Sequence, residues 1–149
     1  MIGHKTICGF TMPELVMVLV ITAILAAVAG PRFFTQSEFD ERGFYDQVTA
    51  AARFAQKYAV TSGLPVRFTV AANSFALTQS NGTAPVQNPG TFTAFTGAEA
   101  GITLTMTPTS SITFDALGTV PTISNSQATV TVGSRSFIIH GATGFVAAP

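Results

Sequence analysis

One carboxylate, Glu14, lies near the start of a long uncharged apolar segment and is the side chain with the clearest chemical consequence. No charged residue occurs between Leu15 and Gly30, and the run from Phe10 to Gly30 has 21 residues. As a helix, a run of this length can cross a hydrocarbon core of ~30 Å. An unpaired carboxylate inside lipid costs at least ~2.5–3.5 kcal/mol. The sequence therefore predicts that something pairs with Glu14.

The segment before the apolar run has an unusual order for an export signal. An ordinary secretory signal has a basic region, then an apolar core, then a small-residue cleavage site. Here the basic region with His4 and Lys5 is followed at once by Gly9 and Phe10, and the apolar run comes afterwards. Cleavage after Gly9 would leave the apolar helix as the new N-terminus. Pro13 is compatible with that helix, because a proline in the first turn has no hydrogen-bond partner to lose.

The residues Gly9, Phe10, Thr11 and Glu14 resemble the class III signal of type IV prepilins and pseudopilins. This resemblance implies that a prepilin peptidase cuts after Gly9 and methylates the amine of Phe10. It also implies that Glu14 meets the N-terminal ammonium of a neighbouring subunit during filament assembly. Two opposite charges that are each costly in lipid offset one another when they pack together. The alternative interpretation is a simple N-terminal anchor that happens to contain a glutamate.

The composition limits the classes of function that the chain can have. Its 149 residues correspond to one domain and its helix, and its formal net charge is zero. Loss of Lys5 with the leader would leave six basic against seven acidic side chains. A broad basic surface for nucleic acid is therefore not expected. The single cysteine, Cys8, lies in the leader, so the mature protein is expected to have neither a disulfide nor thiol chemistry.

A second helical region is expected beyond the apolar run, with a kink at Gly30 and Pro31. Proline removes a backbone hydrogen bond and crowds the preceding turn. Apolar residues then recur at helical spacing as far as residue 59, and Ser62-Gly63 followed by Pro65 should end the helix. The apolar positions are Phe44, Val48, Ala51, Ala52, Ala55, Tyr58 and Ala59, and Asp46, Arg53 and Lys57 lie on the opposite face.

The remaining residues predict short β-strands, because they are nearly uncharged and Thr and Ser supply 26 of the 89 residues from Thr61 onward. Gly133-Ser134 fits a two-residue hairpin loop of type II′, which would pair Val130 with Phe137 and Ala128 with Ile139. Residues 80–100 are expected to be a loop with one strand at 91–95. Alternation predicts the other strands at 65–70, 75–79, 102–107, 112–114, 128–132, 135–139 and 144–146.

The predicted fold is α+β, with a long N-terminal helix packed on an antiparallel β-sheet head. The helix consists of a hydrophobic anchor that continues into an amphipathic half. The expected segments are a leader at 1–9, a transmembrane and assembly helix at 10–30, an amphipathic helix at 31–62 and a β-rich head at 63–149.

Residues 31–70 resemble the GspH/FimT family of minor pseudopilins, and also the minor pilin of MSHA-type pili. The resemblance depends on Arg53, Ala55, Ala59, Pro65 and Val66, and residues 112–118, ITFDALG, resemble the family's Phe-Asp-x-x-Gly turn. It implies a structural subunit of a type IV pilus or a type II secretion pseudopilus, in the bacterial inner membrane with its head in the periplasm. The implied partners are other pilin or pseudopilin subunits, the prepilin peptidase and inner-membrane lipid. No cofactor, nucleic acid or small-molecule substrate is expected.

Few other side chains suggest chemistry. His140 is interpreted as a strand-end side chain and Asp115 as an Asx-type turn former. The charged group Glu38, Asp40, Glu41 and Arg42 is interpreted as a solvated helix face, with a subunit contact as the alternative. The sequence Asn81-Gly82-Thr83 fits a glycosylation sequon but is also a turn signal. A membrane-tethered periplasmic enzyme is a weak alternative, because the sequence has no His-carboxylate cluster, metal-ligand cluster or nucleophile-base arrangement.

A DNA-binding minor pilin is the runner-up function. One branch of the family takes up DNA through a C-terminal Gly-Arg-x-Arg motif, and the corresponding residues here are Gly144-Phe145-Val146-Ala147, in which both arginines are missing. Arg135 is the one weak candidate, and it could neutralise about one phosphate, against the ~6–10 contacts of tight DNA binding. DNA uptake by this subunit is therefore disfavoured.

Overall fold

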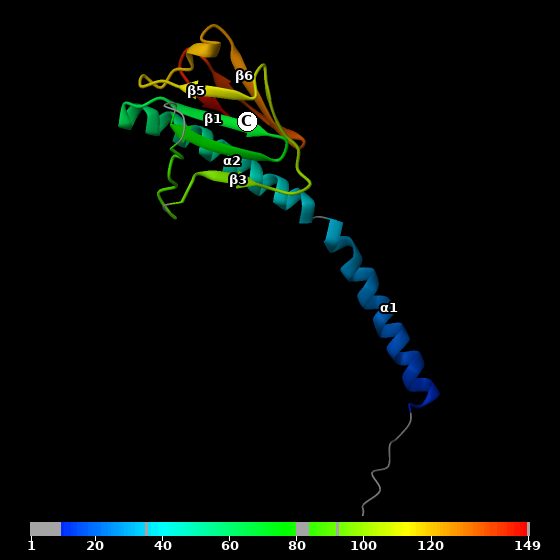
Figure 1. Cartoon of the computed structure of the whole chain (residues 1–149). Coiled ribbons are helices and arrows are strands. Elements are labelled where there is room, and N and C mark those ends of the chain that lie inside the picture. The colour runs from blue at the N-terminus through cyan, green and yellow to red at the C-terminus, as the bar shows by residue number, and fades with distance from the viewer. Residues whose placement is uncertain (1–9, 35, 80–83, 92, 149) are drawn as a thin grey trace, which may run out of the picture. The chain divides into compact units, whose positions relative to one another are not determined.

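The computed structural model describes residues 10–34, 36–79, 84–91 and 93–148, and the side chains at 28–36 are outside that description (Figure 1). The chain has two compact units, one as far as Glu38 and one from Phe39 onward. The first consists mainly of helix α1, Met12–Phe34, and the second contains most of helix α2, Gln36–Ser62, together with the strands. The second unit is called the head below.

Helix α1 begins directly after Thr11 and continues through Gly30 and Pro31 to Phe34. A proline inside a helix removes one hydrogen bond, and the neighbouring turns can still form. The polar side chain of Thr22 is satisfied within the helix, because its hydroxyl donates to the carbonyl of Val18 at 2.9 Å. The kink expected at Gly30 and Pro31 stays a prediction.

Helix α2 has the buried face and the end that its sequence predicts. Phe44, Val48 and the alanines of the stripe are buried, Tyr58 is half-buried, and the three charged residues opposite are exposed. The helix ends at Ser62, where Gly63 has a φ of +68° and its N–H donates to the carbonyl of Ala59 at 3.0 Å. A left-handed glycine after the last turn is a common helix end, because glycine adopts positive φ without steric cost.

The head contains two four-stranded antiparallel sheets, a number that the sequence patterns do not specify. The first has the order β3-β2-β1-β5, with β1 Val66–Ala71, β2 Ser74–Gln79, β3 Thr96–Ala98 and β5 Ser111–Phe114. The second has the order β4-β6-β7-β8, with β4 Leu104–Thr107, β6 Gln127–Val132, β7 Arg135–His140 and β8 Val146–Ala147. A short 3-10 helix, Pro121–Ile123, precedes β6.

Two hairpins join consecutive strands, and the one predicted at Gly133-Ser134 is confirmed. Ala71 pairs with Ser74, so the first hairpin turns at Ala72-Asn73. In the second, Val130 pairs with Phe137 and Ala128 with Ile139, and Gly133 has the positive φ, +57°, that the turn requires. The register therefore places the apolar residues of β6 and β7 on one face, as the alternation predicts.

The expected strand at 91–95 is wrong, because the strand of this region is β3 at Thr96–Ala98. Its pairing with β2 places Gly97 opposite Phe75, and a Cβ at Gly97 would lie 2.5 Å from Cε1 of that ring. The strand forms at Gly97, because a residue without a side chain leaves room for the ring of Phe75. This requirement comes from a neighbouring strand and cannot be recognised from residues 91–98 alone.

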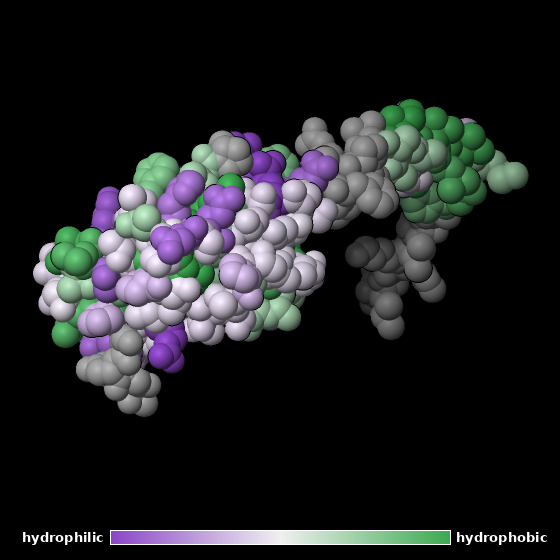
Figure 2. Space-filling view, turned by 90° about the horizontal axis from the view of Figure 1, so that it is seen from above, coloured by the Kyte–Doolittle hydropathy of each residue, from purple (hydrophilic) through white to green (hydrophobic). Residues whose placement is uncertain are grey.

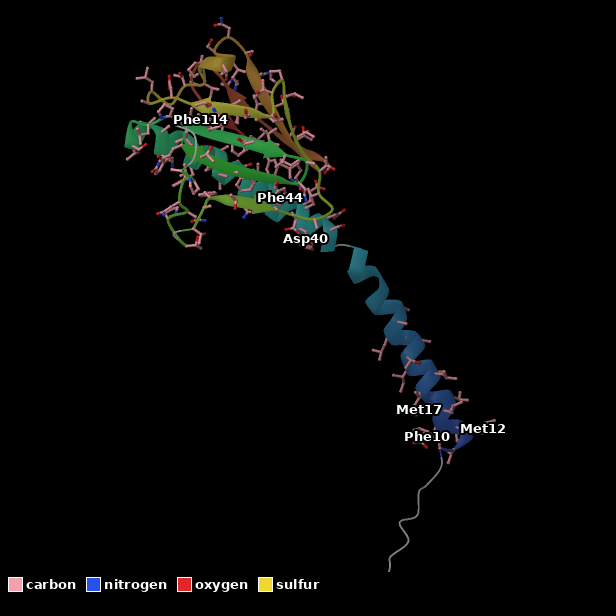
Figure 3. All side chains as sticks on the ribbon, viewed as in Figure 1. Phe10, Met12, Met17, Asp40, Phe44 and Phe114 are labelled. Carbon is pink, nitrogen blue, oxygen red and sulfur yellow. The ribbon has the colours of Figure 1, made fainter. Side chains whose placement is uncertain are left out.

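Helix α2 packs against both sheets and thereby joins them. Phe44 contacts Phe75 of the first sheet, with ring centroids 6.2 Å apart, and Tyr45 contacts Phe137 of the second at 5.9 Å. Ala51, Ala52, Ala55 and Ala59, farther along the same helix, are fully buried, and their small side chains let the helix lie close to the strands. Figure 3 marks Phe44 of α2 and Phe114 of β5, two of the core rings.

Candidate functional site

The start of α1 has one of the two hydrogen bonds of a capping box. Thr11 precedes the helix, its carbonyl accepts from the Leu15 N–H at 3.1 Å, and its own N–H donates to Oε2 of Glu14 at 3.5 Å. The Thr-x-x-Glu spacing is the usual pattern of this motif. A distance of 3.5 Å is long for a hydrogen bond. The carboxylate is therefore held weakly in its own chain and can turn toward a stronger, cationic partner.

The described surface of α1 is apolar on every side. All side chains from Met12 to residue 27 are exposed, with Met12 at 81% and Met17 at 65%, and Phe10 beside the helix is at 73%. The same segment is a continuous hydrophobic surface in Figure 2, and Glu14 is its only charged residue. A helix that is apolar all round is stable only where apolar material surrounds it.

Gly9, on the N-terminal side of the expected cleavage position, lies outside the described residues, as do Cys8 and the possible sequon at 81–83. Gly30 and Pro31 belong to the helical backbone of α1. Among the residues that the structure describes, neither helix combines the length and the apolar character that a membrane span requires.

Asp115 forms the local turn that its sequence predicts. Its Oδ1 accepts from the N–H groups of Leu117 and Thr119 at 3.0 and 2.8 Å, and its Oδ2 accepts from the Thr119 hydroxyl at 2.9 Å. Gly118 completes the turn with a φ of +79°. These hydrogen bonds all come from its own turn, as expected of an Asx-type turn former.

Glu41 has a contact that sequence reasoning missed. Its Oε1 accepts from the backbone N–H of Ser134 at 2.9 Å and from the Ser134 hydroxyl. These two hydrogen bonds, the hydroxyl bond first, lower the pKa of Glu41 below its ordinary value, and nearby Arg135 acts in the same direction. On the solvated helix face that the sequence predicts, this carboxylate also binds the turn between β6 and β7, a contact that the sequence does not indicate. Glu38, Asp40 and Arg42 are exposed, as expected.

The residues near the C-terminus have packing roles. His140 is exposed at the end of β7, and its ring stacks on Phe145 with centroids 6.2 Å apart. Gly144 has a φ of +64°, and a Cβ there would overlap the carbonyl oxygen of Gly118. The glycine of the aligned DNA-uptake motif is therefore needed for close packing.

Arg135, the weak candidate for DNA binding, is exposed at the start of β7. Within the described part of the chain, no cluster of His, Cys, Asp or Glu could hold a metal ion.

Two family models match the chain. Residues 45–143 match type II transport protein GspH, and residues 4–30 match the prokaryotic N-terminal methylation motif. The first match covers well over half of the chain and includes α2 from Tyr45 onward and the strands from β1 to β7. Among curated proteins, no sequence matches the chain significantly.

The fold is similar to that of a solved minor pilin. A crystal structure of the type IV minor pilin FimU from Pseudomonas aeruginosa strain PAO1 superposes with a TM-score of 0.59 at 14% identity, over 78% of this chain and 92% of that one. A second crystal form of FimU gives 0.54 at 14% identity, over 70% and 88%. At this identity the likeness concerns the fold. Because the GspH family model matches more than half of the chain, the chain belongs to the GspH family of type II transport proteins. It is accordingly a subunit of the minor pilin and pseudopilin class.

Proposed function

We propose that this subunit is cut after Gly9, methylated at Phe10 and anchored in the bacterial inner membrane by residues 10–30, with its head in the periplasm. It acts as a structural subunit of a type IV pilus or a type II secretion pseudopilus, and it is not an enzyme. The observation that carries the proposal is the single carboxylate, Glu14, on an apolar helix whose sequence matches the methylation motif.

The role of Glu14 is to pair with the N-terminal ammonium of a neighbouring subunit. Cleavage after Gly9 creates this cation on Phe10, four residues before the carboxylate. At ~4 Å and an effective dielectric constant of ~20, opposite unit charges attract by about 4 kcal/mol. This attraction is comparable with the ~2.5–3.5 kcal/mol that an unpaired carboxylate costs in lipid. The pair therefore favours association between subunits.

The apolar surface of α1 supports the same role. Its side chains from Met12 to residue 27 are exposed. Lipid and the helices of other subunits are the surroundings in which such a surface is stable, and helix–helix contacts in lipid depend on close packing. The proposed partners are accordingly inner-membrane lipid, the prepilin peptidase and other pilin-like subunits.

The proposal includes neither a nucleic-acid partner nor a cofactor nor a substrate. Arg135, the DNA-binding candidate, is a single exposed cation with the Glu41 carboxylate nearby. One arginine can neutralise about one phosphate. The contacts of Asp115 and His140 support structural roles.

The processing step is tested by mass spectrometry of the protein extracted from membranes. We expect Phe10, N-methylated, as the first residue. An intact Met1 or a cut beyond residue 30 would refute the proposed processing, because the apolar helix would then have the wrong start or be absent.

The role of Glu14 is tested by Glu14→Gln and Glu14→Ala in cells that lack the wild-type copy. Glutamine can still act in the capping box but cannot pair with an ammonium, so both variants should insert and be cleaved yet fail to enter the filament. Insertion itself should become easier, because a charge leaves the lipid. The matched control is Glu38→Ala, which removes an exposed carboxylate outside the apolar run. Normal incorporation of Glu14→Gln would contradict the charge-pair role.

A further inference from the structure

A groove in the head lies beside the C-terminal half of α2. It has a volume of about 640 Å³ and lies between this helix and the segment of residues 84–89. Two aromatic side chains of α2 and the end of β2 contribute to it. Its lining consists of Phe54, Tyr58, Gln79, Ala84, Pro85, Gln87, Asn88 and Pro89.

The wall of the groove opposite α2 is fixed by buried contacts. Val86 is fully buried, its N–H donates to the carbonyl of Leu77 at 3.0 Å, and its carbonyl accepts from the N–H of Phe95 at 2.7 Å. The Gln79 N–H also donates to the carbonyl of Ala84 at 2.9 Å. Residues 84–86 therefore continue the first sheet beside β2, and this wall has its shape before any ligand binds.

The aromatic side of the groove is fixed as well. The ring of Phe54 stacks on Phe95, with centroids 5.0 Å apart and planes at 22°. Tyr58 contacts Phe54 at 5.8 Å, and its hydroxyl accepts from Nε2 of Gln79 at 3.4 Å. A binding site that is formed in advance loses less entropy when a ligand binds.

The chemistry of the lining favours an uncharged ligand with many hydroxyl groups. None of the described lining residues carries a charge, so an ionic ligand would have no partner in the groove. The faces of Phe54 and Tyr58 are electron-rich and attract C–H groups. The carboxamides of Gln79, Gln87 and Asn88 offer donors and acceptors at the same site. Because Oδ1 of Asn88 already accepts from the N–H of Gly90 at 2.9 Å, its amino group is the part that can donate.

We propose that this groove binds a neutral saccharide, with the apolar face of a pyranose ring against Phe54 and Tyr58 and its hydroxyls against Gln87 and Asn88. Aromatic faces together with carboxamides complement a sugar, which has an apolar face and a polar edge. A proline-rich peptide would use the aromatic rings, but its prolines have no N–H groups to donate to the carboxamide oxygens. The saccharide is a ligand and undergoes no reaction in the groove.

Tyrosine fluorescence tests this proposal, because the chain has no tryptophan and two tyrosines. Tyr45 is buried, and Tyr58 lines the groove. The full-length chain, in a detergent without a sugar headgroup, is titrated with cellotetraose, chitotetraose and maltotetraose. We expect a saturable change with at least one of them. Gln87→Ala combined with Asn88→Ala should weaken that binding by roughly tenfold or more.

The control is Asn125→Ala, which removes a carboxamide outside the groove and should leave binding unchanged. Near-UV circular dichroism checks that the double variant keeps its fold. Three outcomes would overturn the proposal: no saturable change with any of the three saccharides, binding that the double variant leaves intact, or saturable binding of a polyproline peptide alone. The last would assign the groove to a peptide.

Discussion

Replacing Ala55 with glutamate should destabilise the head strongly. Ala55 is fully buried in the middle of the alanine stripe of α2, where the helix lies close to the strands. A glutamate at this position brings both extra volume and an ionisable group into the core. These two effects can be separated, because only the second depends on pH.

The expected magnitude follows from the burial of Ala55. A fully buried glutamate can have a pKa of ~8–9, against ~4.3 in an unfolded chain. At pH 7 the folded state must then hold a proton that the unfolded state has lost, which costs about 4 kcal/mol at ~1.4 kcal/mol for each pH unit. Overpacking adds ~1–3 kcal/mol. The total of about 5–7 kcal/mol is comparable with the whole stability of a typical domain, ~5–15 kcal/mol.

Urea unfolding of the full-length chain in detergent, followed by near-UV circular dichroism, measures this loss. Ala55→Gln has a similar volume without the charge, and Ala50→Glu adds the same side chain at an exposed position of the same helix. We expect Ala50→Glu to differ from wild type by less than ~0.5 kcal/mol. Between pH 7 and pH 4, Ala55→Glu should recover toward Ala55→Gln by about 4 kcal/mol. A loss below ~1 kcal/mol, or no recovery at low pH, would refute the burial of the stripe against the sheets.

Two further predictions concern polar groups of α2. Thr49 is 5% exposed and its hydroxyl has no hydrogen-bond partner among the described residues, so Thr49→Val should raise the free energy of unfolding by ~1 kcal/mol. Thr61→Val is the control, because the Thr61 hydroxyl is exposed and donates to the carbonyl of Lys57 at 2.8 Å, so it should give no such gain. Equal gains in the two variants would contradict the interpretation that the unpaired Thr49 hydroxyl destabilises the head. Because the folded pKa of Glu41 is lowered from 4.5, its bond to Ser134 should stabilise the head above pH 4.5, and this contribution should be lost as the pH falls through the folded pKa. Glu41→Gln should remove that part of the pH dependence in a denaturation series, whereas an unchanged pH profile would show that Glu41 contributes nothing.

The features that were predicted correctly from the sequence depend on neighbouring residues. The alanine stripe of α2 repeats at helical spacing, and Gly63 followed by Pro65 marks the end of the helix. The hairpin at Gly133 follows from a glycine in a two-residue loop, which sets the pairing of β6 with β7. Each of these signals lies within a few residues of the structure that it specifies. Glu14 is a local signal of the same kind, a charge in an apolar run, and its pairing stays a prediction.

The tertiary structure alone decided the contacts between distant segments. Glu41 and Ser134 are 93 positions apart, and neither has a local pattern that indicates the other. The division into two sheets, the place of β3 opposite Phe75 and the groove beside Tyr58 likewise depend on which strands pair and where α2 packs. The spacing of apolar side chains and the residue types in the turns specify a helix or strand, its exposed face and its nearest partner along the chain. The choice among distant partners is made by packing the whole core at once, because burial and hydrogen bonding are satisfied by the complete set of neighbours.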